Sequence, residues 1–247
     1  MRRAAYDSAP MRRENPEVAT LTAHTQRAPL PASAAVVIDA LARFATDERK
    51  ARIESVIAGR TRRIIPVLER LSDPHNTAAV LRSADAFGAQ EVHVVETAER
   101  FVASTRVAKG SERWLDLVCH ASTDVCVDAL QARGYRVLVA AMDGEMEPAG
   151  LAALGRVAVV FGNEHAGVSA AMRARADGAY RIPMRGFVES LNVSVAAAIT
   201  LSAALAGVVG DLDEGDREQL RARFLLQSID HAEQIVHEHV RRMNAVG

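Results

Sequence analysis

The sequence has few cysteines, and that scarcity limits both the compartment and the chemistry that can be expected. Only Cys119 and Cys126 occur among 247 residues, and their spacing matches neither a zinc-binding nor a redox motif. We therefore expect two free thiols in the core of a cytoplasmic protein, and we expect no metal site. The N-terminus contains arginines but no hydrophobic segment of the signal-peptide type, so secretion is not expected.

The sequence also lacks a large net charge and long hydrophobic runs. The formal net charge is −1, which argues against a uniformly basic nucleic-acid binder but leaves room for a local basic patch. No apolar run reaches the roughly 18 residues that a membrane-spanning helix needs, so no membrane partner is expected. Aromatic residues make up 4% of the chain against 49% for all hydrophobic residues. The core is therefore expected to consist of Val, Ile, Leu and Ala.

The sequence does contain an alternation of short β-branched runs with helical patterns. The runs lie at residues 63–69, 91–96, 136–142, 156–161 and 179–183, and the helical patterns at 76–87, 123–133 and 169–176. This rhythm predicts an α/β fold whose parallel sheet is flanked by helices on both faces.

Four segments are expected along the chain. Residues 1–34 contain several prolines and no apolar periodicity, which predicts a disordered extension. Residues 35–63 form an N-terminal basic helical region, residues 64–210 the α/β domain, and residues 211–247 a C-terminal helical extension. Apolar residues recur at helical spacing over 216–243, which predicts an amphipathic helix there.

Three of the expected strands are followed by unusual segments. Ligands of parallel α/β sheets usually bind beyond the carboxyl ends of the strands, yet the phosphate-binding patterns G-x-G-x-x-G and G-x-x-x-x-G-K-[ST] are absent. The segments found at these ends instead are RLSDPHNTAAVLRSADAFGA, GNEHAGVS and MRGFVESLNVS.

The first segment has both an ordinary and a functional interpretation. Asn76 is suited to be a helix N-cap, with Val80, Ala84 and Phe87 on the apolar stripe. Arg82 lies almost opposite that stripe, near Asp85, where it forms either a surface ion pair or part of a site.

The other two segments have the same two interpretations. Gly162 and Gly167 allow tight turns on either side of Asn163 and Glu164, which is more than an ordinary strand-to-helix turn requires. The triplet Ser190–Leu191–Asn192 either caps a helix through Ser190 or lies where a ligand binds.

In this order and at these spacings, the three segments resemble the three motifs of the SpoU class of RNA ribose 2′-O-methyltransferases, in the SPOUT superfamily. The resemblance covers about residues 48–205. It implies S-adenosyl-L-methionine as cofactor and a C-terminal trefoil knot, in which the last strand and helix of the domain thread through an earlier loop. Pattern alone predicts only a doubly wound sheet, so the knot comes from the resemblance.

Within this class the chain is most similar to the TrmH branch, which methylates guanosine-18 in the D-loop of tRNA. The similarity is carried by the basic segment 47–76 and by AKGSERWL at 108–115. Ribosomal RNA enzymes share all three motifs, so ribosomal RNA and a non-catalytic RNA-binding role remain alternatives. The resemblance also implies a homodimer, with the Ala-rich helix 191–208 and the stripe over 216–243 either at the interface or buried within one subunit.

The resemblance assigns site residues by their positions in the motifs. It implies that Arg82 is the key catalytic residue, acting as a general base. Since a guanidinium stays protonated in proteins, a clamp on phosphate and on the developing oxyanion is the alternative. The residues expected to shape the catalytic site are Asn76, Glu164, Ser190 and Asn192, and those matching cofactor contacts are Ala140, Gly162, Ile182, Met184 and Leu191.

A local excess of positive charge lies ahead of the first motif. Six basic residues fall within fifteen positions, with Glu54 as the only acid between them: Arg49, Lys50, Arg52, Arg60, Arg62 and Arg63. A solvated helix face is the ordinary interpretation. Because the whole chain is nearly neutral, we predict instead that this basic patch contacts RNA phosphates. Lys109 and Arg113, on either side of Trp114, are candidates to extend the patch. Trp114 itself is expected to pack in the core or an interface, with base stacking as the alternative.

Overall fold

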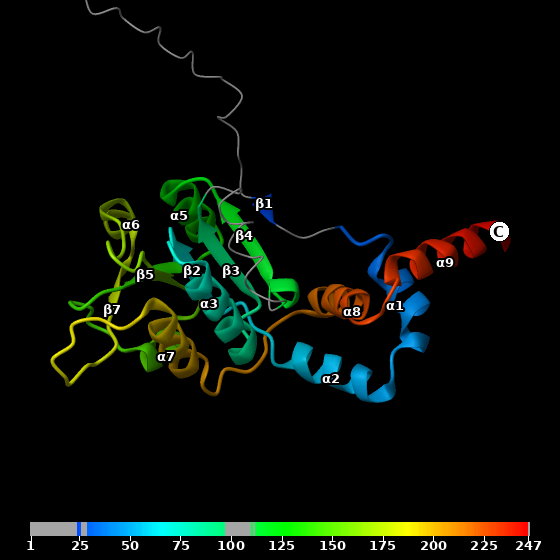
Figure 1. Ribbon diagram of the computed structural model, residues 1–247, viewed down its shortest axis with the longest axis horizontal. Coiled ribbons are helices and arrows are strands. Elements are labelled where there is room, and N and C mark those ends of the chain that lie inside the picture. Colours follow the sequence, from blue (N-terminus) through cyan, green and yellow to red (C-terminus); the bar gives the residue numbers. More distant parts are fainter. Residues whose placement is uncertain (1–23, 26–28, 97–109, 111, 247) are drawn as a thin grey trace, which may run out of the picture.

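The computed structural model of the protein describes residues 24–25, 29–96, 110 and 112–246. Lys109 and most of the segment predicted to be disordered lie outside these residues. The described chain has two parts arranged along its long axis, a layered α/β part and a group of helices (Figure 1). None of its helices combines the length and apolar character that crossing a membrane requires.

The described residues form one seven-stranded sheet in the order β1–β4–β3–β2–β6–β5–β7. The short β1 pairs antiparallel with β4, and the other six strands are parallel, which confirms the predicted parallel α/β sheet. The strands are β1 (His24–Thr25), β2 (Ile64–Glu69), β3 (Glu91–Val95), β4 (Asp116–His120), β5 (Arg136–Ala140), β6 (Val157–Phe161) and β7 (Gly178–Tyr180). Sequence patterns missed β1 and β4, because β1 is two residues long and polar residues occupy both ends of β4.

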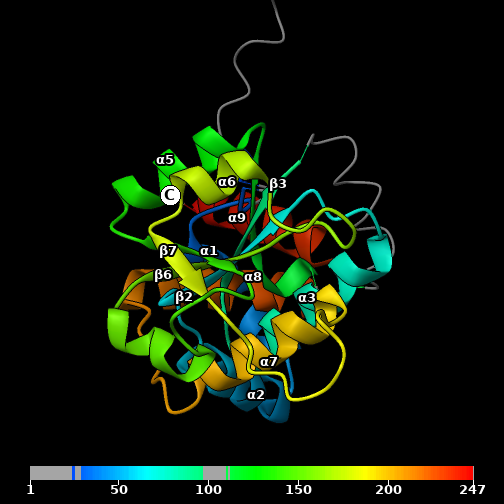
Figure 2. The ribbon, with the colours of Figure 1, turned by 90° about the vertical axis from the view of Figure 1, so that its left-hand side faces the viewer.

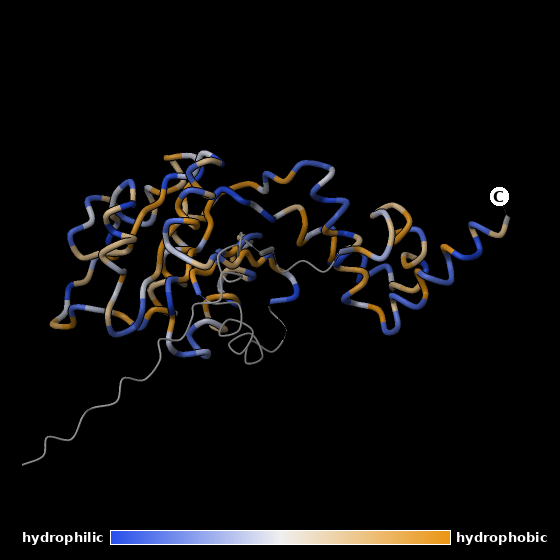
Figure 3. Tube along the Cα trace, turned by 90° about the horizontal axis from the view of Figure 1, so that it is seen from above, coloured by the Kyte–Doolittle hydropathy of each residue, from blue (hydrophilic) through white to orange (hydrophobic). Residues whose placement is uncertain are grey.

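Helices cover both faces of the sheet. One face is covered by α3 (Pro74–Phe87), η4 (Pro148–Leu154) and α7 (Val193–Leu205), and the other by α5 (Thr123–Ala132) and α6 (Ala170–Arg175) (Figure 2). All residues of β2, β3 and β6 are buried, as expected for strands covered on both sides. In Figure 3 hydrophobic stretches follow these strands, and hydrophilic stretches lie at the outer turns.

The helical part is built from helices that lie near the two ends of the described chain. It contains α1 (Ala34–Leu41), η2 (Ala42–Phe44), α2 (Asp47–Ala58), α8 (Glu214–Ser228) and α9 (Ala232–Val246), while η3 (Glu112–Trp114) leads into β4. Leu41, Ile57, Phe224 and Val236 belong to one shared hydrophobic core, so the two helical extensions are a single packed unit. Leu30 and Ala32 also pack against it. The described end of the segment predicted to be disordered is therefore in contact with the helices.

The single amphipathic helix predicted over 216–243 is wrong, because two helices, α8 and α9, lie there. Between them Ile229 is extended, with φ −120° and ψ 128°, and His231 has a left-handed φ of 57°. A helix cannot continue through either conformation. The chain therefore turns, and both apolar stripes reach the same core.

Arg60, predicted to contact RNA phosphate, is instead a buried structural residue. Its side chain is only 2% exposed, it forms an ion pair with Asp85, and it donates to the main-chain oxygen of Asp85 at 3.2 Å. A buried guanidinium deprived of its carboxylate costs about 3–5 kcal/mol. The residue is therefore held against α3 and is not available to a phosphate.

Arg62 is engaged in a similar way, although it is less deeply buried. It pairs with Asp116 at 3.1 Å, with Glu91 at 3.4 Å and with Asp216 of α8. Its main-chain N–H donates to the carboxylate of Asp211 at 3.1 Å. These contacts fasten the helical part to the starts of β3 and β4, so the guanidinium is already neutralised.

Candidate functional site

Four loops meet at one edge of the sheet, because parallel strands end on the same side. They follow β2 (residues 70–73), β5 (141–147), β6 (162–169) and β7 (181–192). The loops after β2, β6 and β7 contain or lead into the three motif segments. The fold therefore brings together segments that are far apart in the sequence.

Glu164, in the loop after β6, is the centre of this edge. Its carboxylate accepts hydrogen bonds from the Ser72 N–H at 2.9 Å, the Ser72 hydroxyl at 2.7 Å and the Asp73 N–H at 3.2 Å. The side-chain amide of Asn76 donates a fourth hydrogen bond at 2.9 Å. Sequence reasoning missed Ser72 and Asp73, although Ser-Asp-Pro before a helix is a recognisable N-terminal signal.

Asn76 connects Glu164 to the third motif. The Asn192 side-chain amide donates to Asn76 Oδ1 at 3.1 Å, so Asn192, Asn76 and Glu164 form a hydrogen-bonded chain. Three of the five predicted catalytic residues are thus in contact, one from each motif. Two capping predictions are wrong. Asp73, not Asn76, caps α3, with Pro74 in the first turn, and Asn192, not Ser190, caps α7 by accepting from the Ser194 N–H at 2.9 Å.

The hydrogen bonds keep Glu164 ionised. Burial opposes ionisation of this carboxyl, but the bonds from Asn76 and Ser72 outweigh burial and lower its pKa to about 2. At neutral pH the loop after β6 therefore presents a fixed negative charge, which accepts hydrogen bonds from the residues at the start of α3.

A pocket of about 410 Å³ opens beside this chain of hydrogen bonds. All five predicted cofactor contacts line it: Ala140, Gly162, Ile182, Met184 and Leu191. Ser190 lines it as well, and so does the whole run of residues 162–167, which includes Glu164. The volume lies within the range of ordinary small-molecule sites.

Gly162 is required by the close approach of two backbone segments. A Cβ at this position would lie 2.3 Å from the main-chain carbon of Gly167, and Gly167 itself has a left-handed φ of 67°. Asn163 closes the same turn by accepting from the His165 and Ala166 N–H groups at 2.9 and 3.1 Å. The side-chain amide of Asn163 donates a hydrogen bond at 2.8 Å to the main-chain oxygen of Arg70. Arg70 has a positive φ of 52°, which is unusual for a residue other than glycine. The two loops are thereby held together.

Arg82 stands apart from these contacts. It lies on the exposed side of α3, six residues beyond Asn76, and no hydrogen bond or ion pair engages it within the described residues. The predicted alternative of an ion pair with Asp85 fails, because Asp85 pairs with Arg60. An exposed guanidinium without a protein partner remains available to an anionic ligand.

The remaining basic residues differ in exposure. Arg49, Arg52 and Arg63 are exposed, whereas Lys50 pairs with Asp47 at 3.1 Å. Trp114 packs edge-on against Phe224 with ring centroids 5.3 Å apart, which favours the packing interpretation for this residue.

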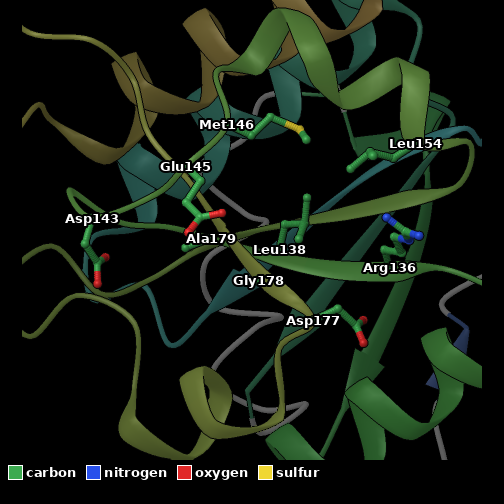
Figure 4. Close-up of a pocket in the computed structure, with 9 residues that line it drawn as sticks. All are labelled: Arg136, Leu138, Asp143, Glu145, Met146, Leu154, Asp177, Gly178 and Ala179. Atoms are coloured by element: carbon green, nitrogen blue, oxygen red, sulfur yellow. The ribbon is translucent and has the colours of Figure 1, made fainter.

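A further cavity, of about 700 Å³, lies at the outer edge of the sheet beside β5 and β7. Figure 4 shows Asp143 and Glu145 at one end of it and Arg136 and Asp177 at the other. It contains none of the predicted site residues, and its carboxylates would repel phosphate. We therefore place the candidate site at the loop edge.

Comparison with known proteins identifies the family of the chain. Residues 63–202 match the family described as the SpoU rRNA Methylase family. The tRNA (guanosine(18)-2′-O)-methyltransferase of Borreliella burgdorferi is 31% identical over 198 residues, which cover 78% of this chain and 91% of that protein.

Two solved structures are similar to this chain. The A. aeolicus TrmH/SpoU tRNA modifying enzyme has a TM-score of 0.65 over 74% of this chain and 98% of that one; at 22% identity this is a likeness of fold. The SpoU methyltransferase AviRb from Streptomyces viridochromogenes, in complex with the cofactor AdoMet, is 28% identical with a TM-score of 0.54. That match covers 62% of this chain and 60% of the AviRb chain.

Replacing Glu164 with Gln tests the hydrogen-bonded charge at the loop edge. Because the folded pKa is lowered from 4.5 to about 2, the stabilisation is complete above pH 4.5 and is lost as the pH falls towards 2. We expect Glu164→Gln to lower the free energy of unfolding at neutral pH, with a difference from wild type that shrinks over that window. Urea denaturation at successive pH values measures it. Glu189→Gln, which removes an exposed carboxylate from the same pocket, is the matched control variant.

Proposed function

Because the chain belongs to the SpoU rRNA Methylase family, we propose that it is an S-adenosyl-L-methionine-dependent ribose 2′-O-methyltransferase acting on guanosine-18 in the D-loop of tRNA. The observation that carries this proposal is the contact of Asn76, Glu164 and Asn192, one from each motif, beside the pocket. The Borreliella relative, matched over 91% of its length, supports tRNA as substrate.

The pocket fits the cofactor chemically. Ile182, Met184 and Leu191 offer an apolar surface for an adenine ring, and the main chain of residues 162–167 offers polar groups. The carboxylates of Glu164 and Glu189 favour a cation in the same pocket. S-adenosyl-L-methionine, when bound, supplies an electrophilic methyl group on a positively charged sulfur.

The protein's own contribution is to position the ribose hydroxyl and to manage its charge. Asn76 and Asn192 hold the starts of α3 and α7 together, so that Arg82, further along α3, has a fixed position relative to the pocket. Arg82 binds an RNA phosphate and stabilises the negative charge that develops on the 2′-oxygen. We prefer this to a general-base role because a guanidinium keeps its proton.

The path of the chain supports the knot. The Arg181 N–H donates to the Met146 main-chain oxygen at 2.8 Å, and a Cβ on Gly144 would lie 2.3 Å from the main-chain carbon of Tyr180. The loop after β5 therefore lies directly against the segment leaving β7. That segment continues into α7, beneath the sheet and against η4 and α3. We infer that it threads through the loop, and the main-chain path in an experimental electron-density map tests this.

We also propose a homodimer, and the exposed side of α7 supports it. Ala197, Leu201 and Ala204 are buried against the sheet, yet Val195 and Ile199 on another side of the same helix are 46% and 40% exposed. The nearby Val188 and Phe187 are also exposed. Exposed apolar side chains on α7 and in the segment leading into it are the kind of surface that a second copy of α7 would cover.

The RNA substrate and its location complete the proposal. Arg49, Arg52 and Arg63 are the members of the basic patch that remain free to contact phosphate. An enzyme acting on tRNA is expected in the cytoplasm. Ribosomal RNA is the second candidate, favoured by the description of the matching family. Nucleoside mass spectrometry after reaction with purified tRNA and ribosomal RNA separates the two, and labelling of neither would favour a non-catalytic RNA-binding protein.

Replacing Arg82 tests the catalytic assignment. We expect Arg82→Ala to slow methylation of tRNA by at least about 100-fold, as loss of a charge-stabilising donor does, with cofactor affinity unchanged by calorimetry. Arg82→Lys should restore activity incompletely, since a single ammonium does not replace a bidentate fork. Arg241→Ala, an exposed arginine at the far end of α9, is the control. Near wild-type turnover of Arg82→Ala would refute the assignment.

Charge reversal tests the corrected RNA-contact patch. The triple variant with Glu at Arg49, Arg52 and Arg63 should bind tRNA more weakly. The slope of log affinity against log salt concentration should fall by about 2–3, roughly one for each lost phosphate contact. Charge reversal of Arg241 and Arg242, two exposed arginines of α9, is the control. An unaltered salt slope in the triple variant would show that these residues do not contact RNA phosphates.

Sedimentation velocity tests the dimer. A stable interface buries more than about 1,000 Å², so we expect the wild-type protein to sediment as a dimer at micromolar concentration. Val195→Glu should produce monomers, because it places a charge at the apolar centre of the contact. Val209→Glu, at an 81% exposed valine beyond the end of α7, should not. A monomeric wild-type protein contradicts the proposal.

A further inference from the structure

The face of the sheet beneath α5 carries ionisable side chains that methyl transfer does not use. Alternate residues of a strand share a face, which places Glu91 and His93 of β3 on this side. Strand pairing aligns His93 with Val118 and Val95 with His120, so the two histidines are diagonal neighbours on adjacent strands. Cys126 lies on α5 in the hydrophobic cluster that covers this face.

The two imidazole rings form a buried chain with Glu91. His93 Nε2 lies 2.6 Å from Glu91 Oε1, and His120 Nε2 lies 2.8 Å from His93 Nδ1. With both rings neutral, His93 donates to Glu91 and His120 donates to His93. That leaves Nδ1 of His120 as an acceptor, and it is buried without a hydrogen-bond partner among the described residues. An unpaired buried nitrogen of this kind is costly and calls for an explanation.

We propose that His93, His120 and Cys126 bind a divalent transition-metal ion, with zinc as the preferred occupant. One nitrogen of each ring and the Cys126 sulfur all lie within 4.8 Å of one another. The histidines are each 1% exposed and Cys126 is 0% exposed. Zinc bonds of about 2.0–2.3 Å would bring tetrahedral ligand atoms to about 3.3–3.7 Å apart. Small side-chain shifts are therefore enough to form the site.

The surroundings of the histidines match those of a metal ligand. A histidine that binds a metal usually donates its other ring N–H to a carboxylate, as His93 does to Glu91. Glu91 in turn accepts from Arg133 at 3.1 Å. A carboxylate in this position holds the His93 ring in one orientation and so directs its other nitrogen, Nδ1, away from Glu91.

A cation can approach from the solvent side. His93 and His120 line a cavity of about 460 Å³. Its wall also contains three carboxylates, Glu91, Asp116 and Asp216, and three guanidinium groups, Arg62, Arg133 and Arg156. Cys126 is not part of that wall, so the ion would lie between the cavity and α5 with its fourth position facing the cavity. Binding moves the His120 proton from Nε2 to Nδ1 of the same ring, so that His120 Nε2 and His93 Nδ1 can each offer a lone pair to the ion. The thiol proton of Cys126 passes to solvent. The sulfur–metal bond forms as the S–H bond breaks.

Cobalt(II) is the spectroscopic probe for this site. The full-length protein, reduced and stripped with a chelator, should develop visible d–d bands of tetrahedral cobalt with one equivalent of Co²⁺. It should also develop a near-ultraviolet thiolate-to-cobalt charge-transfer band, and Zn²⁺ should displace both. Cys126→Ser should abolish the charge-transfer band. Cys119→Ser, at the other buried thiol, should retain it and is the matched control.

Two results would overturn the proposal. One is the absence of a charge-transfer band from wild-type protein at stoichiometric Co²⁺, which is decisive even if a variant fails to fold. The other is a band that survives in Cys126→Ser or disappears in Cys119→Ser, since either places the thiolate elsewhere. Zn²⁺ should also raise the melting temperature of the wild type and of Cys119→Ser, but not of Cys126→Ser. None of these measurements depends on methyl transfer.

Discussion

The arrangement of the candidate site depends on one carboxylate. Glu164 accepts four hydrogen bonds from Ser72, Asp73 and Asn76, and these fix the loop after β6 to the start of α3. Asn76 in turn accepts a hydrogen bond from Asn192, which fixes the start of α7 against the start of α3. An ionised acceptor with this many donors has few alternative partners, so the three motif segments keep one relative geometry. The pocket walls and the helix carrying Arg82 take their positions from that geometry.

Most basic residues ahead of the first motif fall into two groups, those that form buried ion pairs and those that are exposed and proposed to contact RNA. Arg60 and Arg62 turn inward, where carboxylates from α3, β4 and α8 neutralise them. Arg49, Arg52 and Arg63 are exposed and form no ion pair within the part of the chain that the structure describes. The same contacts anchor the helical part beside the sheet and leave the loop edge open, so the fastening of the two parts does not compete with the site.

The two faces of the sheet have different chemistry. The face under α3 and α7 is packed mainly with apolar side chains, and its helices lead to the catalytic loops. Beneath α5, Glu91, His93, Asp116 and His120 point the same way along two adjacent strands. Arginines already neutralise Glu91 and Asp116, whereas Nδ1 of His120 has no hydrogen-bond partner within the described residues. A buried polar atom without a partner is costly, and this histidine pair is the starting point of the metal site that we propose there.

The sequence by itself determined the parallel α/β class, most of the strands, and the motif residues that meet at the loop edge. Those features come from local periodicity and from motifs that are contiguous in the chain. Tertiary structure decided the rest. Only long-range packing sets the buried pairing of Arg60 with Asp85 and the shared core of the two helical extensions. Only strand register, together with the packing of α5 on the sheet, brings His93, His120 and Cys126 together. β4 escaped prediction for a related reason, because its polar ends are satisfied by partners on other strands and helices. Local pattern reports what a segment prefers, but the partner of a charged or polar side chain is fixed by which distant segments the fold places beside it.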